Sequence, residues 1–244
     1  MAKQSSTRSK SDHQATSGKP GSDSRWERVR RLVVRIFAWM VTIPFITFIA
    51  TVGLFGLINP PITTPMALQY IKSRAVSQQS VALDLLPRHL PLAFMAAEDS
   101  EYCHHWGFDL VSLSKSDVGG GASISQQTAR NLFLGQSSGG TLFRLLESFV
   151  TGALELILSK RRIMELYLNT RQYHGGVFGV AAAARQHFDT DPIEFSEEES
   201  ALLAVQFHSV EKEWSDAQIQ QRMVAILESA RQLAKDGRAS CIEG

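Results

Sequence analysis

The sequence predicts an all-α protein, in which one transmembrane helix precedes a compact helical domain. An uncharged run of 23 residues near the start is typical of a membrane span. Helix-capping signals recur through the rest of the chain, and no segment there alternates between apolar and polar residues as a half-buried strand does. A length of 244 residues accommodates one ordinary domain with extensions.

Residues 1–31 are predicted to be a disordered, basic, cytoplasmic tail. The start of the chain is rich in Ser, Lys, Gln and Gly and has no apolar periodicity. Residues 1–35 carry nine Lys and Arg against three acids, a net +6, whereas the whole chain has a net charge of +1. Because the remainder is therefore −5, a general basic surface for nucleic acid is not indicated.

The apolar segment is predicted to form a transmembrane helix over residues 32–58. Its uncharged part, Ile36–Ile58, is about 34 Å long as a helix, enough for a bilayer core of about 30 Å. The alternatives are a buried helix of a soluble protein and a cleaved signal peptide, but the run is long for either, and NPPITTP after it is a poor cleavage site. The basic flank predicts a cytoplasmic N-terminus, with the rest of the chain outside the plasma (inner) membrane.

A linker and membrane-proximal segment, residues 59–84, is expected before the helical domain, residues 85–236, and a C-terminal tail, residues 237–244. Two capping boxes, S-E-E-E at residue 196 and S-D-A-Q at residue 215, mark helix starts, and Ser159 is expected to cap a third helix. Gly237 is expected to end the last helix. The predicted helices cover residues 90–101, 125–134, 142–158, 160–169, 177–188, 196–206 and 215–235.

The two cysteines, Cys103 and Cys241, are 138 positions apart. One pair outside the cytoplasm is able to form a disulfide, but two cysteines are not a disulfide framework. The prediction is that no structural disulfide forms.

Three polar stretches interrupt the pattern of apolar core and charged surface. The first is AAEDSEYCHHWGFD, residues 96–109, in which Glu98 and Asp99 end an apolar run. Either one of these carboxylates has a function at the point where a helix leaves the core, or the two acids are simply solvated. Adjacent histidines beside acids also suggest a metal site, but their spacing matches no established zinc pattern.

The second stretch surrounds Glu147, in a helix that is apolar on two faces and therefore predicted to be largely buried. The first face consists of Leu142, Leu145, Leu146, Phe149 and Ala153, and the second of Phe143, Val150, Leu154 and Leu158. A carboxylate among them costs several kcal/mol unless it is paired or hydrated. Either Arg144 pairs with Glu147 on a narrow solvent stripe, or Glu147 lines a cleft.

The third stretch is GGGASISQQTARNLFL, Gly119–Leu134. Glycines before a helix let backbone N–H groups turn toward an anion, and the helix N-terminus adds a partial positive charge. Arg130, one or two turns further on, is placed to complete such an anion site. The alternative is that the glycines form only a hinge.

Taken in the order of the chain, these three stretches and two later segments resemble motifs of the peptidoglycan glycosyltransferases, glycosyltransferase family 51. EDSEYCHHWGFD is similar to the family's E-D-x-x-F-x-x-H-x-G-x-D motif, and GGASISQQTARNLFL to its G-x-S-T-I-x-Q-Q-x-x-K-N block. FRLLE resembles R-K-x-x-E, SKRRIMELYLN resembles S-K-x-x-I-L-E-x-Y-L-N, and GVFGVAAAARQHF resembles G-x-x-A-A-x-x-Y-F. Order and spacing agree over residues 85–206. The chain is most similar to the monofunctional type, since no penicillin-binding domain follows.

The resemblance implies a lysozyme-like helical fold with a small membrane-proximal lobe, and a transferase of cell wall biogenesis and cell shape. Family members polymerise lipid II, a disaccharide-pentapeptide on undecaprenyl pyrophosphate, into β-1,4 glycan strands and release undecaprenyl pyrophosphate. The implied partners are lipid II, the growing strand, the membrane and other cell wall synthases, and nucleic acid is not among them.

Matched residue by residue, Glu98 is implied to be the general base and Glu147 the second carboxylate, on the donor side. Arg130 and Arg144 match lysines of the family, and an arginine holds phosphate with a bidentate fork. The residues implied to bind substrate are Asp99, His105, Ser123, Gln126, Gln127, Arg130, Asn131 and Arg144. Glu165 matches a residue interpreted as structural, which pairs with a nearby basic residue. No obligatory cofactor is implied, no metal ligand is assigned, and a divalent cation, Mg²⁺ or Mn²⁺, is an optional aid to pyrophosphate departure.

The chain departs from the family pattern at several positions. Tyr102 replaces Phe, Ala122 and Ser123 replace Ser and Thr, and Phe143 replaces the Arg of R-K-x-x-E. The loop at residues 110–119 is short, and FHSVEKEW stands where a Pro-Asn-Pro-like stretch is usual.

Both acids are retained, which favours an active, inverting enzyme. One alternative is a degenerate, non-catalytic protein that binds lipid II or glycan and assists another synthase; the missing Arg and the short loop favour it. A second alternative is a lysozyme-like hydrolase with Glu98 as acid, but a hydrolase has no pyrophosphate for an anion site to bind.

Overall fold

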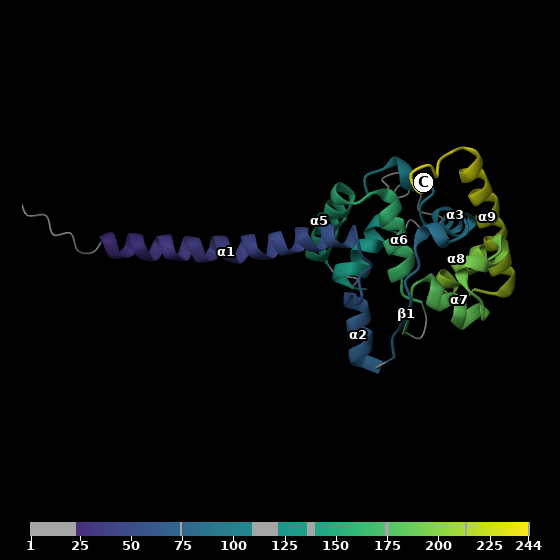
Figure 1. Ribbon diagram of the computed structural model, residues 1–244, viewed down its shortest axis with the longest axis horizontal. Coiled ribbons are helices and arrows are strands. Elements are labelled where there is room, and N and C mark those ends of the chain that lie inside the picture. Colours follow the sequence, from purple (N-terminus) through teal and green to yellow (C-terminus); the bar gives the residue numbers. More distant parts are fainter. Residues whose placement is uncertain are drawn as a thin grey trace, which may run out of the picture. The chain divides into compact units, whose positions relative to one another are not determined.

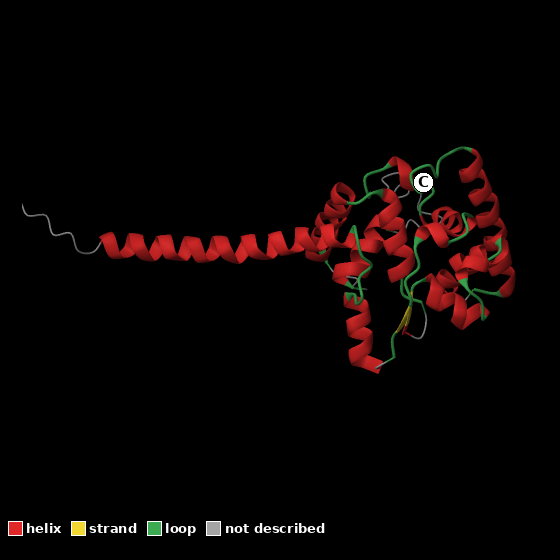
Figure 2. Ribbon diagram, viewed as in Figure 1, coloured by secondary structure: helices red, strands yellow, loops and turns green. Residues whose placement is uncertain are grey.

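The structure is a computed structural model that describes residues 23–73, 75–108, 122–135, 140–173, 176–212 and 214–243. Helices joined by short loops make up almost all of the described chain, with one short pair of strands (Figure 2). The predicted all-α class is confirmed. The chain divides into two compact units, residues 1–48 and residues 49–244.

The helix α1 runs over Asp23–Phe55. Among the helices of the described residues, it is the one that is long and apolar enough to cross a membrane. Pro44 lies inside α1 without ending it. Residues 23–31, which were predicted to belong to the disordered tail, are helical, and residues 1–22 lie outside the described residues. The helix extends into the charged flank because an ion pair four residues apart, Arg31 Nη2 to Glu27 Oε2 at 3.1 Å, supports another turn.

The second unit begins within α1 and contains the remaining elements (Figure 1). The α-helices are α2 (Thr64–Ser73), α3 (His89–Glu98), α4 (Ile124–Ala129), α5 (Thr141–Ile157), α6 (Lys160–Thr170), α7 (Val180–Phe188), α8 (Glu197–Lys212) and α9 (Asp216–Lys235). The tighter 3₁₀ turns are η1 (Leu83–Leu85), η2 (Tyr102–His104) and η6 (Pro192–Glu194), and η4 (Arg130–Leu134) is a wider π-helical turn. Residues 59–84, predicted to be a linker, contain α2 and η1 and belong to this unit.

Two groups of helices build the core of the second unit. In one group α3 packs against α8 and α9, and α8 packs against α9. In the other, α4 packs against α5 and α6. Figure 1 shows α3, α8 and α9 on one side of this unit and α5 and α6 on the other. The residues that join the two groups come from the end of α3, from α4 and from the segment after α6.

A short parallel strand pair connects distant parts of the second unit. Strand β1 (Ser77–Gln78) pairs with β2 (Val177–Phe178), and the helix predicted from residue 177 begins only at residue 180, as α7. Gly179 between them has φ +83°, and a Cβ there would lie 2.7 Å from the carbonyl oxygen of Asn169. The sequence did not predict the strands because two residues are too few to show alternation.

Most predicted helix ends are confirmed by their caps. The hydroxyls of Ser159, Ser196 and Ser215 each accept a hydrogen bond from the backbone N–H three residues later. At Ser196 the box is reciprocal, and its hydrogen bonds to the Glu199 carboxylate lower the pKa of that group. The helix α3 ends at Glu98, earlier than predicted, because Asp99 leaves the helical conformation with φ −159° and ψ 78°.

The prediction that no disulfide forms is wrong. Cys103 and Cys241 are joined, with their Cα atoms 5.5 Å apart. The segment after α9 folds back, with Ala239 and Ile242 buried, and Arg238 Nη1 donates to Glu101 Oε1 at 3.0 Å. A separation of 138 positions along the chain says nothing about distance in space, which is why the sequence did not reveal the pair.

Candidate active site

Glu98, the last residue of α3, is held through both carboxylate oxygens. Arg171 Nη2, just after α6, lies 2.7 Å from Oε1, and Gln127 Nε2 on α4 donates to Oε2 at 2.9 Å. Arg171 Nη1 also donates to the Gln127 side-chain oxygen at 3.3 Å, which closes a ring of three side chains. Glu98 and Arg171 have side chains only 4% and 2% exposed. The acid is therefore oriented before any substrate arrives.

The two adjacent glutamines of α4 have different tasks. Gln127 Nε2 also donates to the carbonyl oxygen of Ala122 at 2.9 Å, so that its amide is fixed in one orientation toward Glu98. The Gln126 side chain accepts from the backbone N–H of Ser123 at 3.0 Å, and the Ser123 hydroxyl accepts from the Gln126 N–H at 3.2 Å. This capping box starts α4 and so places Gln127 one residue further on.

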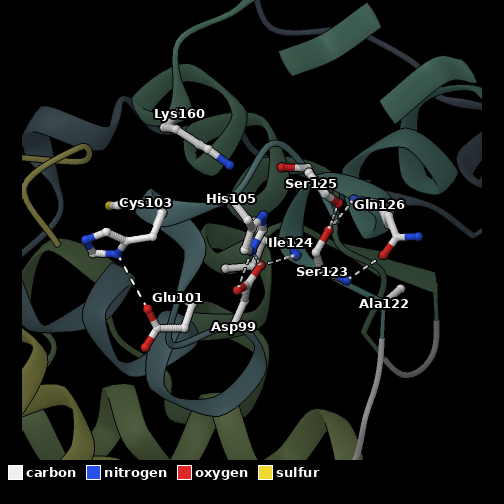
Figure 3. A network of polar contacts seen from close by, with 12 residues as sticks. Asp99, Glu101, Cys103, His105, Ala122, Ser123, Ile124, Ser125, Gln126 and Lys160 are labelled. Carbon is white, nitrogen blue, oxygen red and sulfur yellow. Dashed lines mark hydrogen bonds and ion pairs between the residues drawn. The ribbon is translucent and has the colours of Figure 1, made fainter. Parts of the chain in front are cut away.

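Asp99, which follows Glu98 in the chain, is buried and forms hydrogen bonds on two sides. Its two carboxylate oxygens lie 2.8 Å and 3.0 Å from His105 Nε2, and the backbone N–H of Ile124 donates to Oδ2 at 3.2 Å. Figure 3 shows Asp99 between the His105 ring and the start of α4. This differs from the expectation that the start of α4 is open to a substrate anion, because Asp99 already occupies it. Gly119, Gly120 and Gly121 lie outside the described residues.

Ser123, also expected to bind substrate, is buried and donates its hydroxyl to the carbonyl oxygen of Gly107. Gly107 has φ +79°, and a Cβ there would lie 2.6 Å from the Thr151 methyl group. Ser123 and Asp99 therefore hold the loop after α3 against the start of α4.

Glu147, on α5, forms an ion pair with Arg130 and not with Arg144. The distance from Arg130 Nη2 to Glu147 Oε1 is 2.9 Å, and the Glu147 side chain is 3% exposed while that of Arg130 is 37% exposed. Arg144 is exposed, and no ion pair joins it to another described residue. Tertiary packing of α4 on α5 thus replaces the expected pair within one helix.

Arg130 lies where α4 changes into the π-helical turn η4. The N–H of Gly135, whose φ is +76°, donates to the carbonyl oxygen of Arg130 at 2.7 Å and ends this turn. The sequence predicted one continuous α-helix here. Such π-turns occur frequently at functional sites, and this one also buries Asn131, which was expected to bind substrate.

A second buried polar layer supports the loop after α3. Glu155 forms an ion pair with Lys160 at 2.7 Å and accepts a hydrogen bond from the hydroxyl of Ser125. Tyr102 donates its hydroxyl to the carbonyl oxygen of Lys160 at 2.8 Å. Burial, and next the negative charges of Glu155 and Asp99, raise the pKa of Tyr102 well above its usual value, so it remains a neutral donor. The Lys160 and Ser125 side chains are visible above His105 in Figure 3.

Glu165 has the structural role that was predicted. It pairs with Arg162, and its Oε2 accepts from the backbone N–H of Leu83 at 3.2 Å. It thereby joins α6 to η1.

Arg171 was missed at the level of sequence. It lies four residues after Tyr167 and eight after Ile163, on the buried face of α6 continued past its end. Its guanidinium carbon lies 5.0 Å from the Tyr167 ring centre and 5.7 Å from that of Phe94. The sequence signal that could have identified Arg171 is its register with the apolar face of α6.

The described residues do not by themselves form a metal site. They contain no cluster of three or more His, Cys, Asp or Glu side chains close enough to hold an ion. His105 is bound to Asp99, and Glu147 faces Arg130. The donor set beside Glu147 is one carboxylate and one guanidinium, which does not fit a resident divalent cation.

Comparison with known proteins places these residues in a family context. Residues 65–231 match the sequence pattern of the transglycosylase family. A biosynthetic peptidoglycan transglycosylase of Caulobacter vibrioides is 31% identical over 228 residues, covering 88% of this chain and 96% of that protein. A protein of the same name from Xanthomonas campestris pv. campestris is 32% identical over 241 residues, covering 90% and 98%. Another from Shewanella frigidimarina is 40% identical over 154 residues, covering 60% and 67%.

Proposed function

The chain belongs to the transglycosylase family and is a peptidoglycan glycosyltransferase, and we propose that it polymerises lipid II with Glu98 as the general base. The observation that carries this assignment is the ring of Glu98, Gln127 and Arg171, which fixes the orientation of a carboxylate at the end of a core helix. General bases need this kind of preorganisation.

In the proposed reaction, Glu98 accepts the proton of the acceptor's GlcNAc 4-hydroxyl. The hydroxyl oxygen forms a bond to the anomeric carbon of the donor's MurNAc. The bond from that carbon to the pyrophosphate oxygen breaks, and its electron pair leaves with undecaprenyl pyrophosphate. One displacement converts the α-linked donor into a β-1,4 linkage, and no covalent enzyme intermediate is required.

Negative charge develops on the leaving pyrophosphate, and Arg130 is placed to receive it. Glu147 is buried and holds the Arg130 side chain by one Nη, while more than a third of that side chain remains exposed. The arginine is thus a tethered cation whose exposed part is available to phosphate oxygens. Arg144, exposed on α5, adds a second cation on the same helix as Glu147.

No step in this scheme passes through a metal ion, because the described donor set does not hold one. A divalent cation remains an optional part of the proposal, carried in with the pyrophosphate. Adding Mg²⁺ or Mn²⁺ to a metal-depleted assay tests it directly.

The catalytic unit also has a candidate membrane surface. The helix α5 was predicted to be largely buried, but most residues of its first apolar face are exposed. Its exposed residues are Leu142, Leu145, Leu146 and Phe149, at 71%, 63%, 47% and 51%. An exposed apolar face of this size marks an interaction surface. We propose that it contacts the outer leaflet of the plasma membrane, where a lipid-linked donor is held.

The decisive experiment is incubation of the purified full-length protein with labelled lipid II. Long glycan strands are the expected product. Binding of lipid II without polymerisation, with and without divalent cation, would instead support the non-catalytic binder. Shortening of preformed strands would support the hydrolase. Family membership and the retention of both acids favour the transferase.

A further inference from the structure

We propose that Arg171 is a positioning residue that sets the pH range in which Glu98 works as a base. Its buried guanidinium keeps the Glu98 carboxylate ionised and turned in one direction, so that the enzyme remains active under mildly acidic conditions. This inference rests on the proposed role of Glu98.

The burial of Arg171 is the first step in the argument. Its side chain is 2% exposed, and an arginine does not lose its proton inside a protein. A buried charge without a partner costs several kcal/mol, so a counter-charge has to be present. Glu98 Oε1, at 2.7 Å, supplies it. An ionised Glu98 is therefore part of the stable fold, and not only of the reaction.

The second step is that Arg171 has little freedom to move away. Its backbone N–H donates to the carbonyl oxygen of Tyr167 at 3.0 Å, and its own carbonyl oxygen accepts from Gly179 at 2.8 Å. The guanidinium lies against the rings of Phe94 and Tyr167, which favour a cation over their faces. Only Gly tolerates the backbone at position 179 in such close contact with Asn169, so this support is built into the chain.

The described neighbours Gln127, Asp99 and Tyr173 do not supply this positive charge. Gln127 is neutral and is itself oriented by Arg171. Asp99 is negative, but His105 and the Ile124 N–H meet its charge. Tyr173 lies nearby and is buried; burial raises the pKa of its hydroxyl far above the working range, so it stays neutral.

The sign of the effect follows from these charges. Without the guanidinium, the carboxylate is protonated at higher pH, and a protonated Glu98 accepts no proton. An opposite charge in contact with a carboxyl group shifts its titration by about 1 to 3 pH units. The acid limb of the pH–rate profile should therefore move upward by about that amount. At high pH the carboxylate is ionised in both proteins, and the carboxylate that lacks the guanidinium beside it is the stronger base.

The test compares kcat/KM for lipid II polymerisation between wild type and Arg171→Leu from acidic to alkaline pH. The activity ratio of variant to wild type should rise with pH, and Arg171→Lys should restore most of the acidic activity with a point charge. A purely structural loss would lower activity by the same factor at every pH and would overturn the proposal. Arg162→Met, which breaks the largely buried pair with Glu165 away from the site, should keep the shape of the wild-type profile.

A stability measurement covers the case in which Arg171→Leu folds poorly. Removing both charges in Glu98→Gln/Arg171→Leu should give a higher Tm than Arg171→Leu alone, because the buried negative charge is removed together with the guanidinium that faces it. A double variant as unstable as the single one would contradict the proposal. These outcomes are distinct from failure of the proposed function, which would appear as a wild type that makes no strands or a Glu98→Gln variant that makes them normally.

Discussion

Arg130 and Glu147 face each other between η4 and α5, with Nη2 2.9 Å from Oε1. The acid is buried and the cation is partly exposed, so the pair presents positive charge to the surface and keeps negative charge behind it. This asymmetry suits the binding of a pyrophosphate. It also means that substitutions of Arg130 and of Glu147 should have different effects.

We expect Arg130→Ala to weaken lipid II binding and turnover together. The variant removes the cation that we propose contacts the pyrophosphate in the ground state, and it leaves Glu147 buried without Arg130. Binding measured on lipid II vesicles and single-turnover rates check this. Arg222→Ala on α9, an arginine that contacts Trp214, is the matched control and should leave both unchanged. Normal affinity in Arg130→Ala would rule out the pyrophosphate contact.

Glu98→Gln should instead lose rate and keep affinity. The amide preserves shape but accepts no proton, and loss of a general base typically lowers the rate about 10²- to 10⁴-fold. The measurement is strand synthesis at saturating lipid II, together with lipid II binding. Glu228→Gln, an exposed acid on α9, is the isosteric control. A Glu98→Gln enzyme that polymerises at the wild-type rate would show that another group is the base.

The disulfide should contribute substantially to stability. Closing a long loop with one bridge typically stabilises a domain by about 2–4 kcal/mol, so Cys103→Ser and reduced wild type should unfold at lower denaturant concentration than oxidised wild type. Cys103→Ser/Cys241→Ser is the control, since reductant should no longer affect its unfolding. Equal stability of the oxidised and reduced proteins would contradict the prediction.

The exposed α5 face should lie at the lipid surface when the full-length protein is in vesicles. An environment-sensitive fluorophore on Leu145→Cys should report an apolar surrounding and be quenched by brominated lipid. The same label on Val224→Cys, which is exposed on α9, should report water. Equal spectra at the two positions would mean that the α5 face is not a membrane surface.

The topology of the chain has its own test. Nine basic residues precede Ile36, so the N-terminal flank should stay in the cytoplasm and the helical domain should be exported. A reporter fused after Gly244 should be active on the outer side of the plasma membrane. Reporter activity confined to the cytoplasm would overturn both the topology and the proposed site of lipid II polymerisation.

The helices were predictable because their signals are local. Capping serines such as Ser159 and Ser215 act within three residues, so reading the chain in order is sufficient to find them. Strand β2 and the π-turn at Arg130 were not predictable, because each depends on contacts with residues far away in the sequence.

The site was predictable in its residue types but not in its pairings. Glu98 and Gln127 were both among the predicted site residues, and they meet in space. Arg144, one helical turn away, was one of two alternatives for Glu147, the other being a place in a cleft, whereas packing supplies Arg130 as its partner. Arg171 was missed because its register with the apolar face of α6 points to no partner until the fold brings it to Glu98.

The bond between Cys103 and Cys241 has a consequence for biogenesis. It joins the segment that carries Asp99 and His105 to the segment that follows α9, so the helices α4 to α9 lie between its ends. If the unit is exported as proposed, the bond closes only after α9 has crossed the membrane into an oxidising compartment. A molecule halted in transit keeps a free thiol at Cys103. The oxidation state of this pair is therefore a chemical record of whether translocation was completed.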